Sequence, residues 1–146
     1  SGYTSNILQM ANFQIRTSDN QCIRFRLYED EAPATCRAFS GHLPFLRLFF
    51  HARVSGREIW IDDAPRLDVI QENASVFAKP GEIVIAPIRP VRNKITGCIG
   101  IFYGEGQLLD CGNIFGKVWE EDLPLLEALG DAIWRNGAQE LTFEHI

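Results

Sequence analysis

The chain has 146 residues, of which 46% are apolar and 23% are charged, a composition typical of a folded globular domain rather than of a disordered chain. Its formal net charge is −5 and it contains no long basic run, which argues against nucleic acid as a partner. No apolar stretch approaches the roughly 20 residues that a membrane-spanning helix needs, so no membrane partner is expected either.

The first predicted element is a β-hairpin. Phe13 and Ile15 alternate with polar residues, and Ile23 and Phe25 do the same a few positions later. Asn20 lies between the two segments, where it favours a turn. The pattern therefore predicts two short strands that bury one face.

A short helix is expected next. Pro33 follows the acidic stretch 29–31, and proline and acidic groups both suit the first turn of a helix. Cys36 and Phe39 continue at helical spacing, and Gly41 offers a stop.

The middle of the chain alternates between strands and loops. Residues 46–54 read as an aromatic-rich strand, and residues 57–61 as a returning strand in which Glu58 and Trp60 face away from the two isoleucines. Residues 62–79 have no clear period and are expected to form a long excursion.

Glycines punctuate the next region. Residues 83–85, 98–103 and 114–119 read as strands. Residues 104–106, Gly-Glu-Gly, predict a hairpin turn, and the Cys-Gly-Asn at 111–113 interrupts the returning strand.

The second helix has the clearest pattern. Leu126, Leu129 and Ile133 belong to an apolar stripe at helical spacing. Asp122 is predicted to cap the start of this helix, and the Asn-Gly at 136–137 to end it.

A closing strand through Leu141 and Phe143 completes a pattern of about eight strands and two helices. Short strands separated by glycine-rich turns predict a mainly β fold, an antiparallel barrel with a helix at each end. We expect residues 1–11 to be a flexible N-terminal segment and residues 12–146 to form a single domain.

Four cysteines are scattered along the chain. They show no Cys-x-x-Cys spacing and have no nearby histidines, so we predict no metal site and no cofactor. Reduced thiols in a cytoplasmic protein are expected, with a bridge between Cys98 and Cys111 left open if the flanking strands pair.

Residues 25–39 resemble the opening of the cyclophilins, in which a strand runs into a helix through the motif F-x-L-[FY]-x-D-x-[AV]-P-x-T-x-x-x-F. The rest is similar to a branch of small bacterial and archaeal cyclophilin-like proteins with no settled function. That second likeness rests on residues 51–56, 72–74, 79–83, 112–115 and 116–143. The resemblance implies a cyclophilin-like antiparallel β-barrel over about residues 12–145.

The chain differs from true prolyl isomerases at the position of their catalytic arginine. Ala52 stands where the catalytic arginine of that family is expected, and Arg53 comes one residue late. In a strand, a shift of one residue turns the side chain to the opposite face. We therefore expect negligible prolyl isomerase activity.

Several side chains are candidates for a site. His51 and Arg53 would share a strand face, and the planar fork of Arg53 could hold a carboxylate or an amide oxygen. The alternative for Arg53 is an ion pair with Glu58 across the hairpin. Tyr103 and Trp60 could line a pocket or simply pack in the barrel.

Three more candidates lie in the long excursion and at the interrupted strand. Glu72 could act as a general base and Asn73 could orient an amide, although turn chemistry also explains such residues. Asn113 could face a ligand or could mark a β-bulge.

From these residues we predict a protein that binds a small organic acid or amide in a cleft on the barrel wall. Arg53 and Asn113 would hold the anion while Glu72 or His51 moves a proton, in a hydrolase, lyase or isomerase step. Whether the protein is an enzyme stays open. The alternatives are a cyclophilin-like peptide-binding module, a vestigial prolyl isomerase and a non-catalytic accessory subunit. Homo-oligomerisation is also left open.

Overall fold

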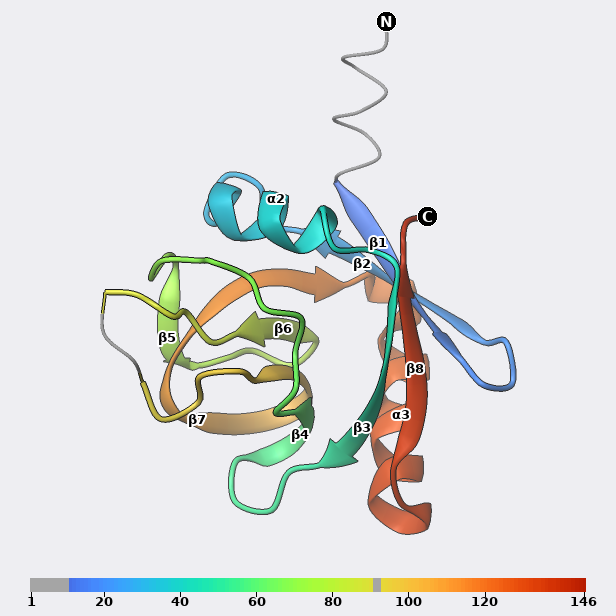
Figure 1. Ribbon diagram of the computed structural model, residues 1–146. Helices are drawn as coiled ribbons and strands as arrows, with labels where there is room; N and C mark the ends of the chain where they lie inside the picture. Colours follow the sequence, from blue (N-terminus) through green and yellow to red (C-terminus); the bar gives the residue numbers. More distant parts are fainter. Residues whose placement is uncertain (1–10, 91–92) are drawn as a thin grey trace, which may run out of the picture.

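The computed structural model describes residues 11–90 and 93–146, so most of the expected N-terminal segment lies outside the described residues. Within those ranges the fold is mainly β, with eight strands in one antiparallel sheet and two α-helices (Figure 1). The predicted class and element count are confirmed. The elements are β1 (Asn12–Thr17), β2 (Cys22–Leu27), α2 (Pro33–Ser40), β3 (Phe45–His51), β4 (Gly56–Ile61), β5 (Ala74–Phe77), β6 (Glu82–Ile85), β7 (Ile99–Val118), a 3-10 turn (Glu120–Asp122), α3 (Leu123–Asn136) and β8 (Gln139–Glu144).

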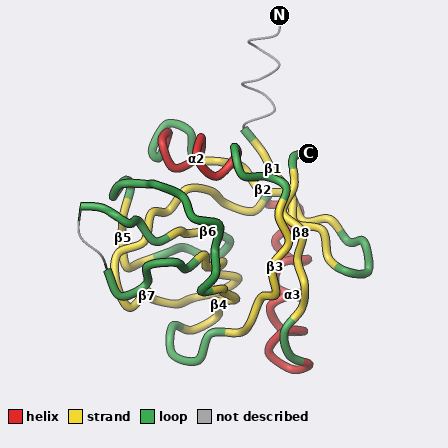
Figure 2. Tube along the Cα trace, viewed as in Figure 1, coloured by secondary structure: helices red, strands yellow, loops and turns green. Residues whose placement is uncertain are grey.

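The strands follow the order β2-β1-β8-β3-β4-β7-β5, and β6 pairs with β7 (Figure 2). β2 also pairs with β7, so the last strand but one of this path contacts the first. The predicted β1–β2 hairpin is present, with Phe13 opposite Phe25. Its turn contains Asn20 at φ +66°, a left-handed conformation that asparagine tolerates.

The predicted turn at residues 104–106 is wrong, because β7 runs through these residues without reversing. Neither Gly104 nor Gly106 has a positive φ. A methyl group at position 106 would overlap the carbonyl oxygen of Ser55, so Gly106 serves close approach rather than a turn. β7 instead curves around β6 (Figure 1), and Ile83 of β6 pairs with both arms of β7.

Two other boundaries differ from the sequence prediction. The aromatic strand ends at His51 instead of residue 54, and residues 53–55 form a bend. The excursion over residues 62–79 contains a strand, β5, which pairs with the middle of β7. β5 shows no alternation in burial, since its residues are half-buried or exposed, so the sequence carries no period there.

The main core lies on one side of the sheet and receives both helices. α2 contributes Cys36 and Phe39 to it, and α3 contributes the predicted leucine and isoleucine stripe. Ile59 and Ile61 of β4 also face this core. A smaller cluster lies apart from it and is made by Ala78, Val84, Phe102, Leu108 and Ile114.

α3 begins and ends where expected, but its predicted N-cap residue has another role. Asp122 occupies the N-cap position and makes no capping hydrogen bond. Its carboxylate instead accepts hydrogen bonds from the guanidinium of Arg24 at 2.7 and 2.8 Å. The charged pair holds β2 against the start of the helix and keeps the pKa of Asp122 low.

Candidate functional site

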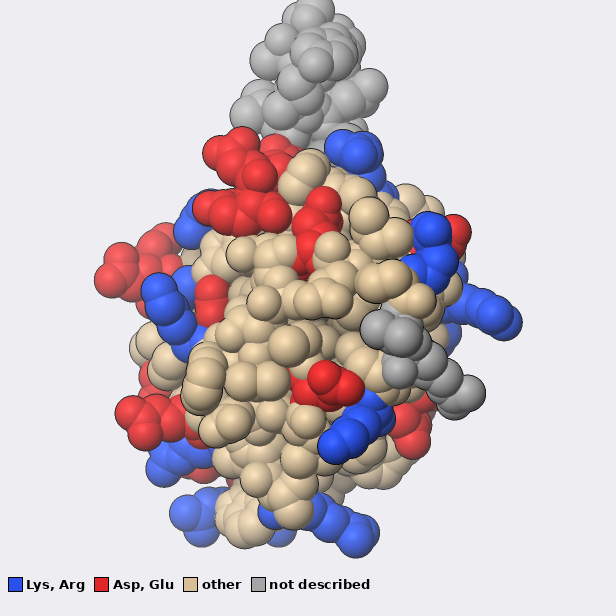
Figure 3. Space-filling view, turned by 90° about the vertical axis from the view of Figure 1, so that its left-hand side faces the viewer, with Lys and Arg blue, Asp and Glu red and all other residues tan. Residues whose placement is uncertain are grey.

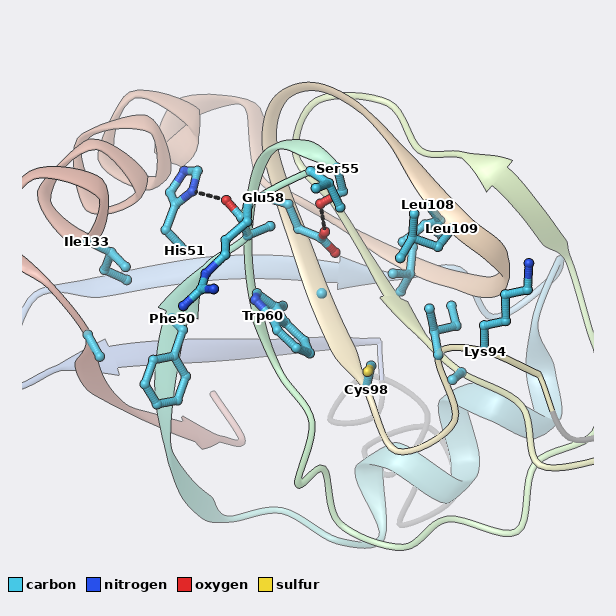
Figure 4. A pocket seen from close by; sticks show the side chains of 18 of the residues that line it. Phe50, His51, Ser55, Glu58, Trp60, Lys94, Cys98, Leu108, Leu109 and Ile133 are labelled. Atoms are coloured by element: carbon cyan, nitrogen blue, oxygen red, sulfur yellow. Dashed lines mark hydrogen bonds between the residues drawn. The ribbon is translucent and has the colours of Figure 1, made fainter.

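A cavity of about 580 Å³ opens beside β4, on the face that Glu58 and Trp60 share. Its volume lies in the range of small-molecule sites. Figure 4 shows Phe50, His51 and Ile133 along one side of it, and Leu108 and Leu109 along the other. The lining residues are Phe50, His51, Ala52, Arg53, Val54, Ser55, Glu58, Trp60, Val84, Ala86, Lys94, Ile95, Cys98, Gly100, Leu108, Leu109, Ile133, Gly137 and Ala138.

Glu58 is the one carboxylic acid among the described residues that line this cavity. The residue is only 5% exposed, and burial in mainly apolar surroundings raises the pKa of its carboxyl group to about 7. The hydroxyl of Ser55 donates a hydrogen bond to Oε1, which favours the charged form but does not offset the burial.

Gly100 makes room for this carboxyl group. It lies on the neighbouring strand opposite Trp60, and a methyl group at position 100 would overlap Oε2 of Glu58. Any larger residue there would push the carboxyl group out of its place. The missing side chain at Gly100 therefore leaves room for the Glu58 carboxyl group at the cavity.

His51 lies at the end of β3 with both ring nitrogens engaged. Nδ1 lies 2.7 Å from the carbonyl oxygen of Ala52, and Nε2 lies 2.7 Å from the hydroxyl of Tyr103. A carbonyl can only accept, so Nδ1–H donates to the Ala52 carbonyl, while Nε2 shares a hydrogen bond with the Tyr103 hydroxyl. These two contacts hold the His51 ring edge-on to the Trp134 ring, with the ring centroids 4.7 Å apart.

Arg53 is exposed in the bend after β3. The expectation that it alternates with His51 on one strand is wrong, because the strand ends two residues earlier. Arg53 nevertheless lines the cavity together with His51. No ion pair joins Arg53 to Glu58 in the described part of the chain, so the cross-hairpin pair is not formed.

The other three candidates form a separate cluster at the start of α2. Glu72 accepts hydrogen bonds from the backbone N–H groups of Ala34 and Thr35 and from the Thr35 hydroxyl, at 2.7 to 3.2 Å. These bonds outweigh desolvation and lower its pKa. The Glu72 carboxylate thus caps a helix whose own N-cap residue, Ala32, supplies no side-chain hydrogen bond.

Asn113 completes this network and is fully buried. Its side-chain oxygen accepts from the backbone N–H of Glu72, and its amide donates to the Thr35 hydroxyl and to the carbonyl of Ile70. Asn73 has a left-handed φ of +47° and donates to the carbonyl of Ile114. The structure therefore brings His51, Arg53 and Tyr103 together, and it places Glu72, Asn73 and Asn113 elsewhere.

Glu58 was not expected as a site residue and entered only as an ion-pair partner of Arg53. One signal was available: Glu58 alternates with two buried isoleucines and shares its strand face with Trp60. A charged residue on a strand face usually indicates that the face is exposed to solvent. Here Val84 of β6 and Leu108 and Leu109 of β7 line the same cavity as Glu58.

The cysteines and the metal prediction can also be compared with the structure. All four cysteines are free. Cys98 lies in the cavity wall, where burial raises its thiol pKa to about 11. Across residues 11–90 and 93–146, no group of three or more His, Cys, Asp or Glu side chains could hold a metal ion.

Residues 14–145 match the family described as "Protein of unknown function (DUF3830)". The chain belongs to the DUF3830 family. No curated protein matches it. No helix in the described ranges is long and apolar enough to span a membrane.

Solved structures share the fold of this DUF3830 member. McbB, solved in complex with tryptophan, aligns with a TM-score of 0.69 at 18% identity and covers 90% of this chain. This chain spans only 44% of McbB. The hypothetical protein AF2241 from Archaeoglobus fulgidus aligns with a TM-score of 0.66 at 19% identity, covering 93% of this chain and 95% of its own.

Proposed function

We propose that this protein binds a small organic molecule in the cavity beside β4 and that Glu58 exchanges a proton with it. The proposal rests mainly on the carboxyl group of Glu58, which is nearly buried, has a pKa of about 7 and faces a cavity of about 580 Å³. A group with that pKa is present in both protonation states near neutral pH. General acid–base groups work best in that situation.

The lining suggests the kind of ligand. Phe50, Trp60, Leu108 and Leu109 suit an apolar or aromatic body, and Glu58 suits an N–H or O–H donor. Arg53 lies at the same cavity and would pair with an acid or amide group of the ligand. McbB, which shares the fold, was solved with tryptophan, so tryptophan belongs among the first compounds to test.

His51 has a positioning role in this proposal. Both of its nitrogens are engaged, so it holds the Ala52 carbonyl and the Tyr103 hydroxyl in place instead of moving a proton. The earlier assignment of proton transfer to Glu72 gives way to Glu58, because Glu72 caps α2 and is not among the residues that line the cavity.

We also propose that the sheet is a cyclophilin-like barrel in a cytoplasmic protein. The return pairing of β2 with β7 supports a barrel, and the motif at residues 25–39 supports the cyclophilin likeness. Negligible prolyl isomerisation is still expected, since Arg53 sits in an exposed bend.

A ligand screen tests the proposed function. Melting temperature would be measured at pH 8 with tryptophan, related indole and phenyl acids, their amides and proline-containing peptides. We expect at least one acid or amide to stabilise the fold by mass action and Glu58→Gln to weaken its binding roughly tenfold. Glu127→Gln on the exposed face of α3 is the matched control. Stabilisation by peptides alone, or equal binding by Glu58→Gln, would overturn the proposal.

Arg53→Ala is expected to weaken the binding of an acidic ligand roughly ten- to a hundredfold, because a charged hydrogen bond is worth about 1.5–3 kcal/mol. The melting temperature of the free protein should stay nearly unchanged, since Arg53 is exposed. Calorimetric titration and thermal melts of the same samples measure both quantities. Normal affinity together with an early melt would mean that Arg53 is structural.

A further inference from the structure

A second cavity of about 470 Å³ lies against the same chain segment. Residues 51–54 line both cavities, so this segment is the wall between them. The second cavity has a different character, because three of its ten described lining residues are arginines. Its residues are His51, Ala52, Arg53, Val54, Gly56, Arg57, Tyr103, Asp131, Trp134 and Arg135.

The three arginines reach this cavity, defined here as the arginine pocket, from three parts of the fold. Arg53 comes from the bend after β3, Arg57 from β4 and Arg135 from the last turn of α3. Asp131 is the one acidic residue among its described lining residues. Three guanidinium groups and one carboxylate leave an excess of two positive charges in the pocket.

Close packing surrounds two of the residues that line the pocket, Arg57 and Tyr103. The stem of Arg57 lies directly over Gly104, where an added methyl group would come within 3.0 Å of the Arg57 Cβ. A methyl group at Gly130 of α3 would overlap the ring of Tyr103. The Trp134 ring, 63% exposed, contacts His51 and forms a flat side. These contacts restrict where Arg57 and Tyr103 can point.

No ion pair within the described residues involves Arg53, Arg57 or Arg135, whereas Arg16, Arg24, Arg47 and Arg89 each have an acidic partner. Figure 3 shows Lys and Arg side chains along the lower edge of the molecule, the level at which the β3–β4 connection lies in Figure 1. The positive charge of the pocket is therefore left for a ligand.

We propose that the arginine pocket binds a doubly charged oxyanion, a phosphate group. Guanidinium forks match the oxygens of phosphate in geometry and charge, and arginines from separate elements can surround a tetrahedral group. The site lies beside the Glu58 cavity and shares Arg53 with it. Arg57 and Arg135 line only the arginine pocket, so the proposal does not depend on the function proposed for the Glu58 cavity. The phosphate could be free or could belong to a small phosphate ester, and these two sources share the same recognition.

Nuclear magnetic resonance can locate the binding. The chain has three tryptophans, and they lie in different places: Trp134 in the arginine pocket, Trp60 in the Glu58 cavity and Trp119 at a third surface. The indole N–H signals would be followed at pH 7.5 during titration with inorganic phosphate, glycerol phosphate or sodium chloride at matched ionic strength.

We expect phosphate to shift the Trp134 signal saturably, with the other two signals nearly still and chloride without saturation. The double variant Arg57→Met/Arg135→Met should weaken phosphate binding at least roughly tenfold. Arg66→Met, an exposed arginine that lines neither cavity, should not. Tighter binding of glycerol phosphate would assign the group to a phosphate ester, and equal or weaker binding would assign it to free phosphate.

Three results would overturn the proposal. The first is a Trp134 shift that does not saturate or that chloride reproduces. The second is phosphate affinity unchanged in the double variant, whose fold the same spectra would verify. The third is equal loss of affinity in Arg66→Met, which would mean that overall charge, not the pocket, attracts the anion.

Discussion

Replacing Glu58 with glutamine is expected to stabilise the folded protein above pH 7 and to leave its stability nearly unchanged below pH 4.5. The pKa of this carboxyl group is about 7 in the fold and 4.5 as a reference value. Folding therefore favours the protonated form, and the cost of an ionised Glu58 grows as pH rises from 4.5 to 7. The difference of about 2.5 pKa units corresponds to roughly 3 kcal/mol.

Urea unfolding of wild type and Glu58→Gln at several pH values between 4 and 8.5 measures this effect. The difference between the two free energies of unfolding isolates Glu58, because carboxyl groups with lowered pKa, such as Glu72 and Asp122, contribute equally to both proteins. Glu127→Gln should show no such difference. A constant gap across the whole pH range would mean that Glu58 does not titrate near neutrality.

Replacing Asn113 with leucine is expected to lower the free energy of unfolding by about 3 kcal/mol or more. The substitution removes three hydrogen bonds in a fully buried place. It leaves the backbone N–H of Glu72 and the carbonyl of Ile70 without these partners, and it loosens the loop that caps α2.

Urea unfolding at pH 7 measures this cost, with Asn136→Leu at the exposed end of α3 as a control that should change stability by less than about 0.5 kcal/mol. Binding of whichever ligand stabilises the wild type should persist in folded Asn113→Leu. Intact stability with lost binding would instead return Asn113 to the ligand site.

The elements that the sequence predicts well are those with short-range signals. The β1–β2 hairpin follows from strict alternation around Asn20, and α3 follows from a leucine stripe ended by Gly137. Each signal lies within about fifteen residues, so no distant contact is needed to read it. The position of Asp122 at the start of α3 was predicted for the same reason. Its hydrogen bond to Arg24 was not predicted, because the two residues are 98 positions apart.

The failures concern contacts between distant segments. Gly104 and Gly106 look like turn residues, but they allow Arg57 and Ser55 to approach the backbone of a continuous β7. β5 has no period of its own and exists because β7 offers it a pairing edge. Glycine composition alone cannot distinguish a reversal from a close approach.

The sequence placed all the candidate residues in one site, and the structure brings only some of them together. His51, Arg53 and Tyr103 do lie together, since β3 and β7 flank β4 in the sheet and the His51 ring reaches the Tyr103 hydroxyl. Glu72 and Asn113 instead lie beside each other, where the Asn113 side-chain oxygen accepts a hydrogen bond from the backbone N–H of Glu72. Glu58 was not expected at a site because its burial depends on contacts with Ser55 and with Gly100 of β7, which the local alternation does not reveal.

Direct titration of the Glu58 carboxyl carbon by ¹³C nuclear magnetic resonance, assigned by comparison with Glu58→Gln, tests the central claim. A midpoint near pH 7 is predicted, and a ligand that occupies the cavity should move that midpoint. A midpoint near 4.5, the ordinary value for glutamate, unmoved by any compound that stabilises the protein, would contradict a proton-exchanging Glu58 at a ligand site.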